Sequence, residues 1–157
     1  MGQALRMLNR REDTRVLSVS PVYRTPPWGK TDQNWFSNAV AMVETSLAPE
    51  QLLEASLTIE KRMKRVRMVR WGPRIIDIDI LAYEGAETFS TVALTIPHPR
   101  MTERGFVLIP LADIAPDLVV NGRSVAAWRD DCDQTGIEKA GYETGWWRRK
   151  TPLVVDP

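Results

Sequence analysis

Apolar side chains recur every three or four positions in two stretches of the chain. Residues 2–11 group Leu5 and Leu8 opposite several arginines, which predicts an amphipathic helix. Residues 48–66 predict a longer helix, with Pro49 near the first turn, where proline is tolerated. The positions at helical spacing in this second stretch are Leu52, Leu53, Leu57, Ile59 or Glu60, and Met63.

Period-two patterns predict strands around these helices. Residues 14–25 alternate in this way, and residues 34–47 resume the pattern around Met42, so we expect the two stretches to pair as a hairpin. The sequence IIDIDILA, residues 75–82, predicts a further strand, and residues 87–120 are rich in short strands, turns and prolines. This order of elements predicts an α+β fold with helices on one face of a sheet.

Length and composition indicate one globular domain over residues 1–157, with 141–157 as a loosely structured tail that Trp146 and Trp147 could anchor. The chain has 43% hydrophobic residues, 26% charged residues and a net charge of +1, so any strong electrostatic feature must be local. Cys132 is the only cysteine, which excludes an internal disulfide. No apolar run reaches the roughly 18 residues of a membrane span, and no signal peptide is evident, so we expect a cytoplasmic protein.

Two carboxylates interrupt the predicted strand over 75–82. Alternation places Asp77 and Asp79 on one face, about 7 Å apart, while Ile76, Ile78 and Ile80 point to the other. Carboxylates at that spacing can share a pair of oxygen-preferring cations. An ordinary solvated sheet face explains the same alternation.

A basic run precedes the two aspartates. Residues 61–74 hold seven lysines and arginines and no acid, and Trp71-Gly72-Pro73-Arg74 ends the run in a rigid turn. A solvated loop at a helix end is one explanation; an anion-binding loop is the other, because guanidinium groups match phosphate oxygens. Carboxylates for Mg²⁺ beside arginines for phosphates indicate phosphoryl transfer, although the chain has no Walker-type glycine-rich loop.

Four motifs resemble one enzyme family. They are YRTPPWG, WFSNAV, RVRMVRWGPRIIDIDIL and IPHPRMTERGFVLIPLADIAP, and their order and spacing over roughly residues 3–140 are similar to 6-hydroxymethyl-7,8-dihydropterin pyrophosphokinase. The resemblance implies a ferredoxin-like α/β sandwich with a central antiparallel sheet. It also implies Mg²⁺-dependent transfer of pyrophosphate from ATP to the pterin hydroxymethyl group, with release of AMP, in folate biosynthesis. The implied partners are these two small molecules, with no nucleic acid and no membrane, and the implied state is a monomer or weak dimer.

The resemblance also assigns site residues. Asp77 and Asp79 match the pair that holds two Mg²⁺ ions. The catalytic set that it implies is Arg65, Arg67, Arg74, Asp77 and Asp79. The ATP-binding set is Glu60, Arg65, Arg67, Trp71, Arg74, Ile80, Thr95, His98 and Arg104. The pterin-binding set is Thr25, Pro26, Pro27, Trp28, Phe36, Asn38 and Phe106, in which the two phenylalanines match positions that sandwich the ring.

The chain departs from the family pattern in two places. Family members begin with a strand carrying a sequence like Ala-Leu-Gly-Ser-Asn-Leu-Gly, whereas this chain starts at the helix that follows it. We expect either a truncated sequence or another segment in that place, for which residues 151–157 are one candidate. Lys64 stands where the family usually has glycine before the first loop arginine.

Two other functional classes fit part of the pattern. The basic run and the expected sheet are compatible with an RNA-binding module, which would bind without Mg²⁺ and with strong salt dependence. A catalytically impaired relative, retained as a binding or folding partner, would be well folded and show no turnover.

Overall fold

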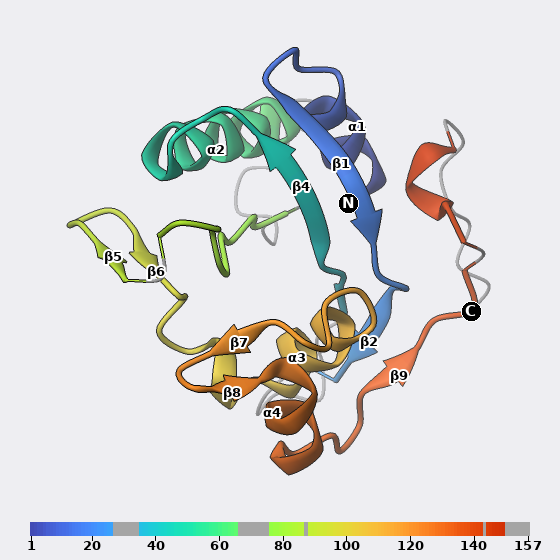
Figure 1. The fold of residues 1–157 in the computed structure, drawn as a ribbon. Coiled ribbons are helices and arrows are strands. Elements are labelled where there is room, and N and C mark those ends of the chain that lie inside the picture. Colours follow the sequence, from blue (N-terminus) through green and yellow to red (C-terminus); the bar gives the residue numbers. More distant parts are fainter. Residues whose placement is uncertain (27–34, 66–75, 87, 143, 150–157) are drawn as a thin grey trace.

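The computed structural model describes residues 1–26, 35–65, 76–86, 88–142 and 144–149, except the side chains of residues 64 and 65. The chain combines helices with strands that pair antiparallel, so the predicted α+β class is confirmed (Figure 1). The helices are α1 (Gly2–Asn9), α2 (Pro49–Arg65), α3 (Gly105–Ala112) and α4 (Val125–Asp131), with 3-10 turns η1 (Met101–Glu103) and η2 (Trp146–Arg148). The strands are β1 (Thr14–Val19), β2 (Tyr23–Thr25), β3 (Phe36–Asn38), β4 (Ala41–Thr45), β5 (Phe89–Ser90), β6 (Thr95–Ile96), β7 (Val119–Val120), β8 (Arg123–Ser124) and β9 (Glu138–Lys139).

Antiparallel pairing between the first two strand regions is confirmed, but each region is divided. β1 pairs with β4, and β2 pairs with β3 on one side and with β9 on the other. The break falls at Pro21, whose nitrogen has no hydrogen to donate to a ladder. Ser20 bridges it: its backbone N–H donates to the Val40 carbonyl at 2.9 Å, and its hydroxyl accepts the Val40 N–H at 3.0 Å.

The exposure of two strand residues differs from the simple alternation. The β1–β4 register shifts between Val16 and Ser18, and Leu17 at that bulge is exposed. Met42, a predicted apolar position of the second strand, is also exposed, while its neighbour Val43 packs against the core. The apolar face of β4 is therefore one residue out of phase with the prediction.

Both predicted helices are confirmed. Figure 1 shows α1 and α2 on the same side of the β1–β4 pair. Ala4 and Leu8 of α1 share a buried cluster with Ile59 and Met63 of α2. The prediction was wrong for Leu57, which was expected on the apolar side of the helix but is exposed and not part of this cluster.

No residue range was predicted for helix α3, which lies in a stretch, residues 87–120, interpreted as rich in short strands and turns. Its sequence, GFVLIPLA, is apolar almost throughout and includes Pro110, so it shows neither a polar face nor a normal helix interior. It contacts α4, β2 and β3, which gives several of its sides an apolar neighbour. Ser124 is the N-cap of α4, and its hydroxyl accepts the Ala127 N–H at 3.2 Å.

The predicted strand over 75–82 is wrong for residues 76–82, which are described and carry no strand pairing. The alternation itself persists: Asp77 and Asp79 are exposed, and Ile80 is buried. Side-chain packing and a backbone hydrogen bond, from the His98 N–H to the Leu81 carbonyl at 2.8 Å, hold this segment in place instead of a ladder. Its apolar residues reach three separate core clusters, through Ile76 and Ile78, through Ile80, and through Leu81.

Two tryptophans anchor the C-terminal region, as the sequence suggested. Trp146 and Trp147 are buried in the cluster that contains Ala4 and Leu8. The Trp146 indole N–H donates to the Ser20 carbonyl at 3.1 Å, and Arg6 donates to the Trp147 carbonyl at 2.7 Å. Within the described ranges, no helix has the length and apolar character needed to cross a bilayer.

Candidate functional site

A cavity of about 240 Å³ lies beside Asp79. Three segments form it: α2, the extended segment of residues 76–82 that carries Asp77 and Asp79 (the acidic segment), and the loop that contains β6. Its lining residues are Leu53, Ile78, Asp79, Ile80, Val92, Ala93, Leu94, Thr95, His98 and Pro99. The fold thus brings together Asp79 with three residues predicted to bind ATP, Ile80, Thr95 and His98.

His98 is tied to the acidic segment through its backbone, and its ring has a defined orientation. Its N–H donates to the Leu81 carbonyl at 2.8 Å. The ring Nδ1 accepts the Arg100 backbone N–H at 3.2 Å, so in the neutral imidazole the hydrogen sits on Nε2. An Nε2–H is a suitable donor to a phosphate oxygen.

Glu60 reaches the acidic segment from α2. It is buried, and its Oε1 accepts the backbone N–H of Ile78 at 2.7 Å. This is the short distance of a charge-assisted hydrogen bond. The contact joins helix and acidic segment across 18 positions of the sequence.

The exposed pair Asp77 and Asp79 fits the requirements of Mg²⁺ bound together with a nucleotide. Mg²⁺ in phosphate sites is usually held by one or two carboxylates plus phosphate oxygens and water. Among the described residues, no group of three or more acidic, histidine or cysteine side chains could hold a metal without such help. The two aspartates therefore suit a metal that arrives with phosphate oxygens.

Part of the predicted pterin set meets at the β2–β3 pair. The Asn38 amide donates to the Thr25 hydroxyl at 3.1 Å, and Thr25 is opposite Phe36 in the register. Phe36 is exposed, and Thr25 is buried. Pro26, just beyond β2, is exposed.

Phe106 comes to the same region on α3, which contacts both β2 and β3. The Arg104 guanidinium lies 5.7 Å from the centre of the Phe106 ring, within cation–π range. One flat aromatic face and one cation thus occupy adjacent positions at the start of α3.

Other predicted site residues lie outside the described part of the chain. They are Pro27, Trp28, Arg67, Trp71 and Arg74, together with the side chain of Arg65. Their assigned roles stay predictions.

A sequence profile described as 7,8-dihydro-6-hydroxymethylpterin-pyrophosphokinase matches residues 1–116. The chain belongs to this family of pyrophosphokinases. It is 54% identical over 125 residues to the 2-amino-4-hydroxy-6-hydroxymethyldihydropteridine pyrophosphokinase of Methylorubrum extorquens, covering 80% of this chain and 78% of the relative. Proteins of the same name from Pseudomonas aeruginosa (44% over 137 residues, 87% and 84% covered) and Bacillus subtilis (42% over 145 residues, 92% and 83% covered) are similar as well.

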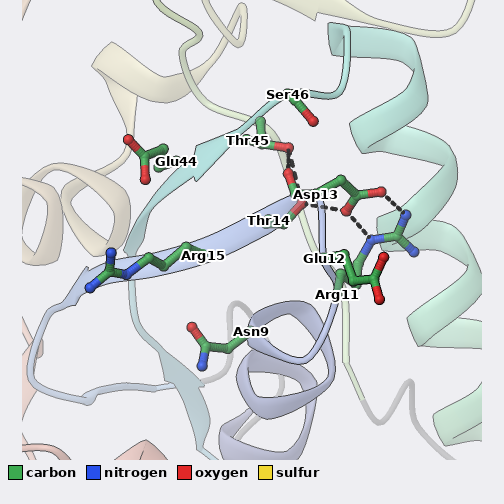
Figure 2. Close-up of a pocket in the computed structure, with 9 residues that line it drawn as sticks. All are labelled: Asn9, Arg11, Glu12, Asp13, Thr14, Arg15, Glu44, Thr45 and Ser46. Atoms are coloured by element: carbon green, nitrogen blue, oxygen red, sulfur yellow. Dashed lines mark hydrogen bonds and ion pairs between the residues drawn. The ribbon is translucent and has the colours of Figure 1, made fainter.

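This pyrophosphokinase has a larger cavity, of about 560 Å³, that contains none of the predicted site residues. Figure 2 shows its lining at the ends of α1, β1 and β4. Arg11 donates to both carboxylate oxygens of Asp13, at 2.8 and 2.7 Å, and the Thr14 and Thr45 hydroxyls lie 2.9 Å apart. The Arg11 hydrogen bond holds the pKa of Asp13 below its ordinary value.

Tyr23 and Asp113 form a contact that no sequence pattern predicts. The Tyr23 hydroxyl on β2 donates to Asp113 at the end of α3 at 2.6 Å. Burial, followed by this hydrogen bond, raises the pKa of Tyr23 to about 12. The two residues are 90 positions apart, and no local pattern pairs them.

Two leucines of the smaller cavity were also missed as site residues. Leu53 was expected only as a helix position facing the core, and Leu94 lies in a stretch interpreted as turns and short strands. Both line the cavity of this pyrophosphokinase. Helical spacing identifies Leu53 as apolar and facing inward, but it does not distinguish packed core from cavity wall.

Proposed function

We propose that this protein transfers pyrophosphate from ATP to the hydroxymethyl group of 6-hydroxymethyl-7,8-dihydropterin, as a step of folate biosynthesis. The observation that carries the proposal is the cavity in which Asp79, Thr95 and His98 meet beside the acidic segment. Membership of the pyrophosphokinase family names the class of reaction. The relatives' printed names supply the substrate.

In the proposed reaction the hydroxymethyl oxygen bonds to the β-phosphorus of ATP. The bond between that phosphorus and the oxygen bridging to the α-phosphate breaks, so the products are the pterin pyrophosphate and AMP, and the hydroxyl proton passes to solvent. Asp77 and Asp79 would hold Mg²⁺, which supplies positive charge beside the phosphates and lowers the pKa of the attacking hydroxyl. The protein's main contribution is to orient two substrates in line.

The chain's own residues divide into two groups in this proposal. On the ATP side, His98 donates from Nε2 to a phosphate oxygen, and arginines neutralise the charge that develops on the phosphates. That side comprises Glu60, Arg65, Arg67, Trp71, Arg74, Ile80, Thr95, His98 and Arg104. On the pterin side, Phe36 and Phe106 stack on the ring while polar groups read its edge. That side also includes Thr25, Pro26, Pro27, Trp28 and Asn38.

The remaining expectations belong to the same proposal. They are a ferredoxin-like sandwich as the complete fold, one domain over residues 1–157 with a C-terminal tail, two Mg²⁺ ions, a cytoplasmic location, and a monomer or weak dimer. The antiparallel pairings and the helices on one side of β1–β4 support the sandwich.

The test is formation of AMP by purified protein from ATP, 6-hydroxymethyl-7,8-dihydropterin and Mg²⁺. We expect AMP and pterin pyrophosphate in equal amounts, and neither when any one component is omitted. A 6-methyl-dihydropterin, which lacks the nucleophilic hydroxyl, is the matched control and should yield no AMP. Formation of ADP would contradict pyrophosphate transfer, and a folded sample without turnover would favour the impaired relative. Salt-sensitive RNA binding without Mg²⁺ would favour the nucleic-acid module.

A further inference from the structure

Glu60 is an acidic residue in a position where acids are unusual. It lies on the core-facing side of α2, between Ile59 and Met63 in the buried pattern, and only 9% of its surface is exposed. Removing a carboxylate from water is costly unless hydrogen bonds compensate. The bond from the Ile78 N–H, at 2.7 Å, provides such compensation.

The partner of Glu60 is the backbone between the two aspartates. The Ile78 N–H belongs to the peptide group that joins Asp77 to Ile78, and Asp79 follows directly. Residues 76–82 have no strand pairing in the described structure, so no ladder holds this peptide. In a sheet, a carbonyl of a neighbouring strand would accept the Ile78 N–H; here the Glu60 carboxylate of α2 accepts it instead.

The geometry also separates Glu60 from the metal-binding role of the aspartates. Asp77 and Asp79 are exposed, whereas Ile78 packs inward against the core cluster that contains Ile59 and Met63. Glu60 therefore approaches the segment from its buried side. Within the described residues, Glu60, Asp77 and Asp79 do not form a three-ligand group for a cation.

We propose that Glu60 is a positioning residue: its carboxylate holds the Asp77–Ile78 peptide and thereby the orientation of the two aspartates. This rests on the proposed function for its catalytic consequence, while the hydrogen bond itself can be tested without turnover. Loss of the acceptor should lower kcat and raise the Mg²⁺ concentration needed for half-maximal rate. A residue that only contacts ATP would instead raise the KM for ATP and leave kcat unchanged at saturation.

Three variants separate these roles. Glu60→Met has similar volume and no acceptor oxygen; we expect kcat to fall about tenfold to a hundredfold, with a higher Mg²⁺ requirement. Glu60→Gln keeps a carbonyl oxygen and should stay within about fivefold of wild type. Ser56→Ala is the matched control, because Ser56 is buried one turn earlier on α2 and its hydroxyl donates to the Leu52 carbonyl at 2.9 Å, with no contact to the acidic segment among the described residues. It should change stability without changing the Mg²⁺ requirement.

Amide hydrogen exchange measured by NMR on the substrate-free protein tests the bond directly. In the wild type the Ile78 amide should be protected, and in Glu60→Met it should exchange at least about tenfold faster while the amides of α1 keep their protection. Exchange of Ile78 at an unprotected rate in the wild type overturns the proposal without any variant, even if Glu60→Met fails to fold. A Glu60→Met enzyme with wild-type kcat and Mg²⁺ requirement also overturns it. An inactive wild type with a protected Ile78 amide contradicts the proposed function instead and leaves the anchoring bond established.

Discussion

The cavity beside β1 and β4 has about 560 Å³, and the cavity beside Asp79 has about 240 Å³, yet the smaller one contains the predicted site residues. In the larger cavity, Arg11 and Asp13 bind each other, and Thr14 and Thr45 are in contact (Figure 2). A ligand that bound to these four side chains would have to replace hydrogen bonds that already exist, whereas Glu12, Arg15 and Glu44 of the same lining have no side-chain partner among the described residues.

The smaller cavity surrounds its polar groups with apolar side chains. Within the described residues, the Asp79 carboxylate has no hydrogen-bond or ion-pair partner, and His98 uses only Nδ1 inside the protein. Apolar side chains of Leu53, Ile80 and Leu94 surround them. The comparison shows that the two cavities differ in setting as well as in volume: the lining of the larger one is polar throughout, whereas the polar groups of the smaller one stand among apolar side chains, as is usual in small-molecule sites.

Asp79→Ala should have the largest effect. It removes a carboxylate that faces the smaller cavity and contributes nothing to the core, so we expect the rate to fall at least about a hundredfold with little change in melting temperature. AMP formation and thermal unfolding measure the two effects. Asp117→Ala, which changes an exposed acid that lines neither cavity, is the control and should keep the wild-type rate. Near-normal activity of Asp79→Ala would show that the smaller cavity does not take part in the reaction through Asp79.

His98→Ala should have the next largest effect. Loss of a donor to a charged oxygen is expected to lower kcat/KM for ATP by about tenfold to a hundredfold, with the KM for the pterin unchanged. Steady-state kinetics with each substrate varied in turn measure this. Arg100→Ala is the control, since Arg100 contacts the imidazole through its backbone N–H, which the variant keeps. A change confined to the KM for the pterin would contradict the assignment of His98 to ATP and indicate that it contacts the pterin.

Tyr23→Phe should affect stability and leave both cavities intact. Loss of the hydrogen bond to Asp113 should cost about 1 kcal/mol in the free energy of unfolding at pH 8. Because the folded-state pKa of Tyr23 is raised from 10.0 to about 12, this stabilisation is complete below pH 10 and is lost as the pH rises toward 12. Urea unfolding at pH 8, 10 and 11 should show the difference from wild type shrinking. A constant difference would contradict the assigned bond, and Tyr142→Phe serves as the control.

Arg11→Ala should have the smallest effect. It opens the larger cavity by removing the partner of Asp13, an ion pair that is partly exposed and therefore weak. We expect turnover within about twofold of wild type and a melting temperature within a few degrees. Since Arg11 lowers the pKa of Asp13, the small stabilising contribution should disappear as the pH falls below the ordinary value of 3.8. A large loss of turnover would show that the larger cavity participates in the reaction.

Local patterns predicted those elements whose stability depends on one amphipathic face. The apolar stripes of α1 and α2 and the pairing of the two strand regions are of this kind. Local patterns did not predict α3, because it is apolar on several sides and contains Pro110. They also did not predict the break at Pro21, which divides one predicted strand into two. They also failed for the phase of β4, because the bulge at Leu17 lies on the partner strand.

The candidate site was predictable to a different extent. The motifs named Asp79, Ile80, Thr95 and His98, and the structure brings these four residues to one cavity. The position of Leu53 in the cavity wall and the hydrogen bond between Tyr23 and Asp113 could not be predicted, since both depend on which segments become neighbours. The acidic segment combines the two cases: its alternation was correct, but its assignment as a paired strand was wrong.

In the acidic segment, covalent order alone makes polar side chains alternate with isoleucines, because successive side chains of any extended chain point to opposite faces. The contacts that hold this segment in place come from other parts of the fold. Three core clusters take its apolar side chains, and Glu60 takes the Ile78 amide. Such contacts join residues distant in sequence, and their formation depends on how the helices pack rather than on any local preference.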